Sequence, residues 1–177
     1  MEFNKSKKIL VIGRAGMDIY PEPPGTKISE VKNFSTHLGG SAANTCVALS
    51  QLGVQSDLLT CVSEDAIGEY IFEKLREFNV GSNLCRRVEN KFQTQVAVVE
   101  TILKNNQSIL YRNNSCDLQL NKNDIDNINF QDYSAVFISG TALSSNPSRD
   151  AVFYATQKAS SLSIPLIIDI DLSLIHI

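Results

Sequence analysis

Short runs of apolar, β-branched residues alternate along this chain with segments whose apolar residues recur every three or four positions. The first run covers residues 9–12 and the second residues 57–62. Continuous apolar runs of this length are typical of strands buried on both faces of a parallel sheet. Between them, residues 42–52 have helical spacing, with Ser41 as a candidate N-cap and Gly53 as the stop. The alternation predicts an α/β fold.

The same alternation returns toward the end of the chain after one interruption. Further segments are expected as a helix at residues 67–78, a buried strand at 135–138, a helix at 149–162 and a buried strand at 166–170. The interruption consists of two β-prone runs, residues 94–103 and 107–111, which the turn-forming residues 104–106 join. We therefore expect a mostly parallel sheet and, beside it, a small antiparallel hairpin.

The composition limits which partners the protein can bind and in which compartment of the cell we expect it. The chain has 16 Lys plus Arg and 19 Asp plus Glu, so its formal charge of −3 gives no electrostatic reason to bind nucleic acid or an anionic membrane. No apolar run approaches the ~20 residues of a transmembrane helix, and the first run is too short for a secretory signal. The four cysteines form no C-x-x-C pair and the two histidines have no ligand-like spacing. We expect reduced thiols, no metal site and a cytoplasmic protein.

Polar residues at the carboxyl ends of parallel strands line the crevice in which α/β proteins bind ligands. Asp18 follows the first strand, where its carboxylate is suited to accept hydrogen bonds from a polyol; the alternative is a solvated residue in a turn. Gly39 and Gly40 run into the first helix and permit a ligand to approach backbone N–H groups. Asn44, in the first turn, offers a donor and an acceptor to a hydroxyl. A packing role for the glycine pair is the alternative.

Arg112 follows the second run of the hairpin. Its guanidinium is planar, permanently charged and matched to carboxylates, so it suits an acid substrate better than a neutral sugar. The alternative is a solvated edge-strand arginine that discourages aggregation. The glycine pair lacks the lysine of a P-loop and the third glycine of a dinucleotide fingerprint, so neither site is predicted.

Several strings together carry a resemblance to a known family. Asp18 after the first strand, GGSAAN at residues 39–44 and VSEDAIG at residues 62–68 resemble the N-terminal half of the ribokinase-like (PfkB) carbohydrate kinases. Within that family, the strings most similar to an acid-sugar kinase of inositol breakdown are GRAGMDIYPEPPG at 13–25, YRN at 111–113 and SGTAL at 139–143.

The resemblance covers residues 7–171 and implies an α/β, ribokinase-like three-layer sandwich with a mostly parallel sheet and a small β lid. It implies that residues 7–177 are the N-terminal part of the kinase domain, with lid segments at about 19–37 and 92–116. The catalytic aspartate and the ATP-binding half are expected beyond the end of the chain, so no catalytic residue is assigned within it.

The resemblance also implies a substrate and cofactors. The substrate is a small acid sugar, bound at its hydroxyls by Asp18, Gly39, Gly40 and Asn44 and at its carboxylate by Arg112. ATP and Mg²⁺ serve the full-length enzyme, with neither bound by this segment alone. A homodimer through the lid is a further expectation, and neither nucleic acid nor a membrane is a partner.

Three departures from the family pattern leave the function open. The family prefers a small residue where this chain has Cys46, and a glycine where it has Ser63. Acid-sugar kinases usually have an arginine shortly after the second aspartate of the Asp-x-Asp string, where this chain continues with Leu172 and Ser173. The alternatives are therefore another acid-sugar kinase, a different PfkB sugar kinase, or a non-catalytic sugar-binding or interaction protein.

Overall fold

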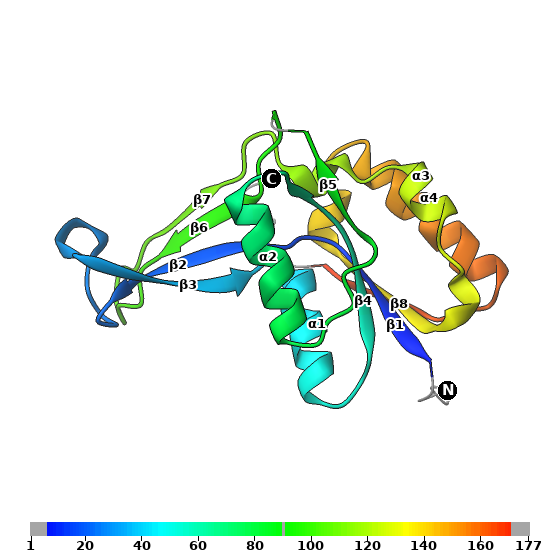
Figure 1. The fold of residues 1–177 in the computed structure, drawn as a ribbon, viewed down its shortest axis with the longest axis horizontal. Coiled ribbons are helices and arrows are strands. Elements are labelled where there is room, and N and C mark those ends of the chain that lie inside the picture. Colours follow the sequence, from blue (N-terminus) through cyan, green and yellow to red (C-terminus); the bar gives the residue numbers. More distant parts are fainter. Residues whose placement is uncertain (1–6, 90, 171–177) are drawn as a thin grey trace.

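The centre of the molecule is a five-stranded parallel sheet. The computed structural model describes residues 7–89 and 91–170, and its strand order is β5-β4-β1-β8-β9 (Figure 1). The strands are β1 (Lys8–Ile12), β4 (Ser56–Ser63), β5 (Cys85–Val88), β8 (Tyr133–Ser139) and β9 (Leu166–Asp169). Each neighbouring pair is parallel, as expected for apolar runs that crossovers separate. The carboxyl end of β1 therefore lies between those of β4 and β8.

Helices cover both faces of this sheet. On one face lie α1 (Ser41–Gln51) and α2 (Ala66–Glu77), and on the other α3 (Lys122–Asp126) and α4 (Ser148–Ser161) (Figure 1). Because side chains alternate along a strand, β1 supplies two cores: Leu10 and Ile12 pack beneath α3 and α4, and Val11 packs beneath α1 and α2. The predicted three-layer α/β fold is confirmed. The 3-10 helices are η1 (Ile28–Glu30), η2 (Cys116–Gln119), η3 (Phe130–Asp132) and η4 (Gly140–Leu143).

A second, small sheet projects from the α/β body (Figure 1). Its order is β3-β2-β6-β7, with β2 (Gly16–Glu22), β3 (Asn33–Gly39), β6 (Gln95–Val99) and β7 (Ser108–Tyr111). The predicted hairpin forms as β6 and β7, which pair antiparallel and turn at Asn105, whose φ is 55°. Asp18 was expected just past a strand, but it lies inside β2, paired with His37 of β3 and Ala97 of β6.

The start of α1 differs from the prediction. Ser41 was expected to cap the helix, but Gly40 is the N-cap and makes no side-chain cap bond. Ser41 is the first helical residue, and its Oγ lies 2.7 Å from Ser139 Oγ at the end of β8. The hydroxyl thus joins the helix to the sheet instead of capping the helix. Gly53 does follow the helix as predicted, with a φ of 75°.

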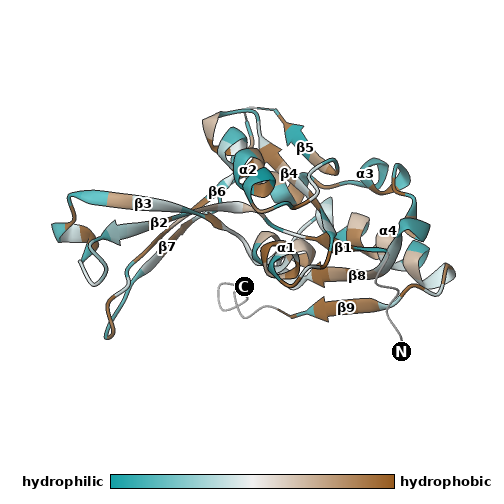
Figure 2. Cartoon of the chain, turned by 60° about the horizontal axis from the view of Figure 1, so that its bottom comes forward, coloured by the Kyte–Doolittle hydropathy of each residue, from teal (hydrophilic) through white to brown (hydrophobic). Residues whose placement is uncertain are grey.

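The last described strand, β9, is exposed. The run 166–170 has the composition of a buried strand, but Ile168 is 54% exposed and Ile170, just past the strand, 74% exposed. In the part of the chain that the structure describes, β9 pairs only with β8, so it forms the edge of the sheet (Figure 2). A strand buried on both faces needs neighbours that an edge strand lacks.

A charged cluster joins the amino ends of the central strands, at the end of the sheet opposite to the site described below. Asp57 is buried, and its carboxylate accepts a hydrogen bond from the Tyr133 hydroxyl at 2.8 Å and pairs with Lys8 Nζ at 3.1 Å. These contacts join β4, β8 and β1. Within residues 7–89 and 91–170, no helix has the length and apolar character needed to cross a bilayer.

Candidate functional site

The turn from β3 into α1 is packed closely against the segment that leaves β1. Gly40 has a φ of 95°, which favours glycine, and a Cβ placed there would lie 2.5 Å from the Arg14 carbonyl oxygen. Likewise, a Cβ on Gly13 would lie 2.8 Å from Ser139 Cβ and 2.9 Å from Ala42 Cβ. Glycines at these positions let the carboxyl ends of β1 and β8 meet the start of α1.

The side chain of Asp18 packs against the backbone of Gly39. A Cβ added to Gly39 would overlap the Asp18 carboxylate, so the absence of a side chain at this glycine makes room for the acid. Burial raises the pKa of the Asp18 carboxyl above its ordinary value, against the opposing effects of Arg14, the Tyr20 hydroxyl and His37. Asp18 is therefore not a solvated turn residue. It is a half-buried acceptor with cationic and hydroxyl neighbours.

A chain of hydrogen bonds runs from the start of α1 to Arg112. Ser41 Oγ lies 2.7 Å from Ser139 Oγ, which lies 2.9 Å from Thr141 Oγ1. The Thr141 carbonyl oxygen then accepts a hydrogen bond from Arg112 Nη2 at 3.3 Å. Ser139 and Thr141 belong to the SGTAL string, so the structure gives that string a local role beside the glycine turn.

Arg112 is held by a buried carboxylate. Its Nη2 donates to Asp117 Oδ2 at 2.6 Å, and Asp117 also accepts a hydrogen bond from the Ser115 hydroxyl. The Arg112 side chain is 19% exposed and that of Asp117 is 4% exposed. The guanidinium is thus not the solvated edge-strand group of the alternative interpretation. Its buried Nε has no hydrogen-bond partner among the described residues.

The predicted site residues fall into two contact groups. Asp18, Gly39 and Gly40 lie together on the β2–β3 side of the turn, whereas Arg112 is joined to Ser41 on the other side. Asn44 is exposed in the first turn of α1, where its backbone N–H donates to the Gly40 carbonyl at 2.9 Å. Between residues 7 and 170, leaving out residue 90, no hydrogen bond or ion pair joins Asp18 or Asn44 to Arg112.

The VSEDAIG string forms the start of α2. Asp65 is its N-cap, and Oδ1 accepts hydrogen bonds from the N–H groups of Ile67 at 3.0 Å and Gly68 at 2.9 Å. The Ser63 hydroxyl donates to the same oxygen at 2.6 Å. Gly68 has no room for a Cβ, because it would overlap the Ser63 carbonyl oxygen. The structure therefore gives this string a structural role.

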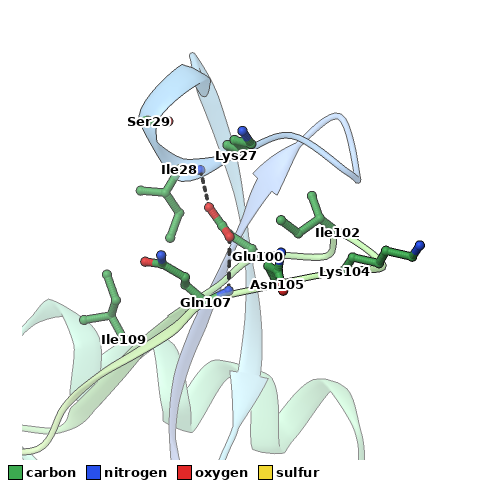
Figure 3. Close-up of a pocket in the computed structure, with 9 residues that line it drawn as sticks. All are labelled: Lys27, Ile28, Ser29, Glu100, Ile102, Lys104, Asn105, Gln107 and Ile109. Carbon is green, nitrogen blue, oxygen red and sulfur yellow. Dashed lines mark hydrogen bonds between the residues drawn. The ribbon is translucent and has the colours of Figure 1, made fainter.

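A cavity of about 520 Å³ lies elsewhere in the small sheet. Glu100, at its centre, accepts hydrogen bonds from the N–H groups of Ile28 at 2.8 Å and Gln107 at 3.1 Å (Figure 3). These bonds hold the β2–β3 connection against the β6–β7 connection. None of the predicted site residues lines this cavity.

Sequence reasoning missed four residues of the site: Arg14, Tyr20, Asp117 and Ser139. Tyr20 had a usable signal, because it lies two positions from Asp18 and residues two apart on a strand share a face. Asp117 had none, since its pairing with Arg112 depends on how the chain folds after β7. The departure at Leu172 and Ser173 lies outside the described residues.

Comparison with known proteins decides the family. Residues 6–172 match the model of the pfkB family carbohydrate kinases. The chain belongs to that family. It is 33% identical over 164 residues to a 5-dehydro-2-deoxygluconokinase of Photobacterium profundum, a match that covers 92% of this chain and 49% of the relative. A 5-dehydro-2-deoxygluconokinase of Clostridium perfringens is 33% identical over 174 residues, covering 97% of this chain and 52% of the relative.

A solved structure supports the same assignment. An uncharacterized sugar kinase from Pyrococcus horikoshii, in complex with ATP, superimposes with a TM-score of 0.80 at 28% identity, covering 93% of this chain and 53% of that one. The ribokinase-like fold expected for a PfkB kinase is therefore confirmed. The chain spans about half the length of the curated relatives it matches.

Candidate metal ligands do not gather in the part of the chain that the structure describes. Within residues 7–89 and 91–170, no group of three or more His, Cys, Asp or Glu side chains is placed to hold a metal ion.

Proposed function

We propose that the protein to which this chain belongs transfers the γ-phosphate of ATP to 5-dehydro-2-deoxygluconate in inositol catabolism, and that residues 7–177 form the N-terminal, sugar-recognising part of its kinase domain. The observation that carries the proposal is the half-buried Asp18 carboxylate lying on Gly39, beside the glycine turn at the carboxyl ends of the central strands. The names of the relatives, at 33% identity, support the choice of sugar.

The recognition chemistry follows from the residues present. Asp18 accepts hydrogen bonds from sugar hydroxyls, and the backbone at Gly39 and Gly40 lets the sugar approach closely. Asn44, exposed at the start of α1, donates to one hydroxyl and accepts from another. Arg112 faces the carboxylate of the sugar, with its orientation fixed by Asp117. Buried polar groups that must pair reject analogues that lack the matching group, so this part sets specificity.

Phosphoryl transfer is proposed for the whole protein only. The transferring phosphoryl group needs positioned donors and a metal, and the described residues hold no cluster of three or more candidate metal ligands. We therefore assign ATP and Mg²⁺ to the remainder of a family kinase, together with the catalytic residue. We propose a cytoplasmic location, supported by four free thiols, of which Cys46, Cys61 and Cys116 are buried.

Calorimetric titration of the chain with sugars tests the proposal. 5-Dehydro-2-deoxygluconate is expected to bind more tightly than 2-dehydro-3-deoxygluconate and far more tightly than neutral fructose. The affinity is expected to fall as the pH is lowered through the pKa of Asp18, which burial raises above its ordinary value, because protonation removes the negative charge and turns one acceptor oxygen into a donor.

Asp18→Asn is the control for this titration. The carboxyl group of the sugar titrates with either protein, so the difference between the two pH profiles isolates Asp18. If 2-dehydro-3-deoxygluconate binds more tightly, the assignment moves to the corresponding kinase. If no acid sugar binds, or if both proteins give the same profile, the role of Asp18 is wrong.

We also propose a homodimer through the small sheet, which would then be the expected lid. The strand register places Met17, Val96 and Tyr111 in one row and Ile19, Val98 and Ile109 in the next row of the same face. Of these, Tyr111 is 60% and Ile109 38% exposed. Such an apolar face is typical of an interaction surface.

Sedimentation equilibrium checks the dimer. Ile109→Ser is expected to convert it to monomers, because it places a hydroxyl in the exposed part of the apolar face, on the edge strand β7. Leu110→Ser is the matched control, since Leu110 is 41% exposed but belongs to the opposite face. A wild-type chain that sediments as a monomer at all concentrations would remove the proposal.

A further inference from the structure

Two glycines and a buried glutamine form the row of the small sheet next to Asp18. Gly16 lies two positions before Asp18 on β2, so the two residues share a face of the sheet. Gly16 pairs with Gly39 of β3 and with Gln95 at the start of β6. Residues that pair across strands also share a face. Gln95 therefore belongs to the Asp18 face, one row nearer to the start of α1.

The amide of Gln95 lies over the backbone of Gly16. A Cβ added to Gly16 would lie 3.1 Å from Gln95 Nε2 and 3.3 Å from its Cδ. A Cβ added to Gly39 would meet the Asp18 carboxylate. Since Gly16 and Gly39 are direct partners in the pairing of β2 with β3, the amide and the carboxylate lie over neighbouring glycines. Both polar groups therefore lie on the same side of a floor of glycine backbone.

The register of β6 with β7 brings Gln95 level with Arg112. The two strands pair antiparallel, with Val96 opposite Tyr111. One step further along each strand, Gln95 comes opposite Arg112. Gln95 thus lies between the two contact groups of the predicted site, with Asp18 on one side and Arg112 on the other.

The amide oxygen of Gln95 is buried without a hydrogen-bond partner. The residue is 3% exposed, and Oε1 accepts no hydrogen bond from residues 7–89 and 91–170. Buried amide oxygens almost always accept at least one hydrogen bond, because burial otherwise costs the group its hydration. An apolar side chain would fill the same place without that cost, so packing alone does not account for a glutamine here. The unpaired oxygen points to a donor that arrives with a ligand.

We infer that Gln95 is a specificity-determining residue whose amide oxygen accepts a hydrogen bond from one hydroxyl of the sugar. The inference rests on the proposed function, which places the sugar carboxylate at Arg112 and other hydroxyls at Asp18. In 5-dehydro-2-deoxygluconate the carbon next to the carboxylate carries no hydroxyl, so the first hydroxyl from the Arg112 end is the one on C3. That hydroxyl is the donor that Gln95 is placed to recognise.

Gln95→Met tests the inference, because methionine has nearly the same length and lacks the amide. The affinity for 5-dehydro-2-deoxygluconate in titration calorimetry is expected to fall about tenfold, the value of one buried hydrogen bond. Wild type is expected to bind the analogue that also lacks the C3 hydroxyl about tenfold more weakly than the parent sugar. Gln95→Met is expected to bind this analogue as tightly as wild type does. The cycle isolates the contact between the amide and the C3 hydroxyl.

Gln93→Met is the matched control for the exchange of glutamine for methionine. Gln93 is exposed, and its backbone N–H donates to the Asn114 carbonyl oxygen at 3.0 Å, a bond that the substitution keeps. This variant should bind both sugars as wild type does. The melting temperature of sugar-free Gln95→Met is expected to equal or exceed that of wild type, because an unpaired buried amide is removed.

The outcomes separate this inference from the proposed function. If wild type binds the parent sugar and Gln95→Met loses affinity equally for both sugars, the glutamine serves only the packing and the inference is overturned. An unchanged affinity for the parent sugar also overturns it. So does a lowered melting temperature, because the amide then has a stabilising partner in the sugar-free protein. If wild type binds no acid sugar, the proposed function itself fails, and the inference fails with it.

Discussion

Gly39→Ala is expected to reduce the affinity for the acid sugar by at least about 100-fold and to lower the free energy of unfolding by about 2 kcal/mol. The added Cβ would overlap Oδ1, Cγ and Oδ2 of Asp18. The backbone of Gly39 is outside the left-handed region, so the whole effect comes from this overlap. The carboxylate must leave its place, and the sugar loses its principal acceptor. Titration calorimetry and chemical denaturation measure the two effects.

A double variant identifies the cause. When Gly39→Ala is combined with Asp18→Ala, the colliding atoms are gone, so stability is expected to recover while sugar binding does not. Gly53→Ala is the control for backbone strain alone, because Gly53 has a φ of 75° and nothing within 4 Å of its added Cβ. If Gly39→Ala binds the sugar as tightly as wild type, Asp18 does not bind from its place on Gly39.

Arg112→Ala is expected to weaken binding of an acid sugar far more than binding of a neutral one, and to cost about 3 kcal/mol of stability. The selectivity follows from the loss of the guanidinium that faces the sugar carboxylate. The stability loss has a separate cause, because Asp117 is left buried and charged without its cation. Affinities for an acid and a neutral sugar measure the loss of selectivity, and denaturation curves measure the loss of stability.

A double variant that also lacks the Asp117 carboxylate is the control for the loss of stability. Arg112→Ala combined with Asp117→Ala removes the unpaired buried charge, so stability is expected to recover, whereas the preference for an acid sugar is not. An equal loss of affinity for acid and neutral sugars in Arg112→Ala would show that the arginine serves only the fold.

Local sequence patterns predicted most of the α/β body. The runs at β1, β4 and β8 are apolar because they are buried from both sides, and the adjoining helices carry a regular apolar stripe. The exposure of β9 has a different source. Its composition matches that of a central strand, and only its place at the sheet edge, which depends on distant segments, makes Ile168 exposed.

The site was less predictable because its contacts join distant parts of the chain. β2 is a strand because β3 and β6 pair with it, and β6 lies about 80 residues further along. The segment has glycine at its start and proline inside it, which local propensity does not favour in a strand. The hydrogen bond between Ser41 and Ser139 spans 98 positions. Single residues in the sequence indicated Asp18 and Arg112 as candidates, but apart from Tyr20 their neighbours in the structure could be found only from the tertiary fold.

One residue, Gly40, connects β3 to α1, since the strand ends at Gly39 and the helix begins at Ser41. The carbonyl of Arg14 fills the space beside Gly40, so the backbone at this junction has little room to bend. Because a single closely packed residue joins the two elements, the end of β3 and the start of α1 keep one relative position, and Gly39 and Asn44 are held on the same rigid junction.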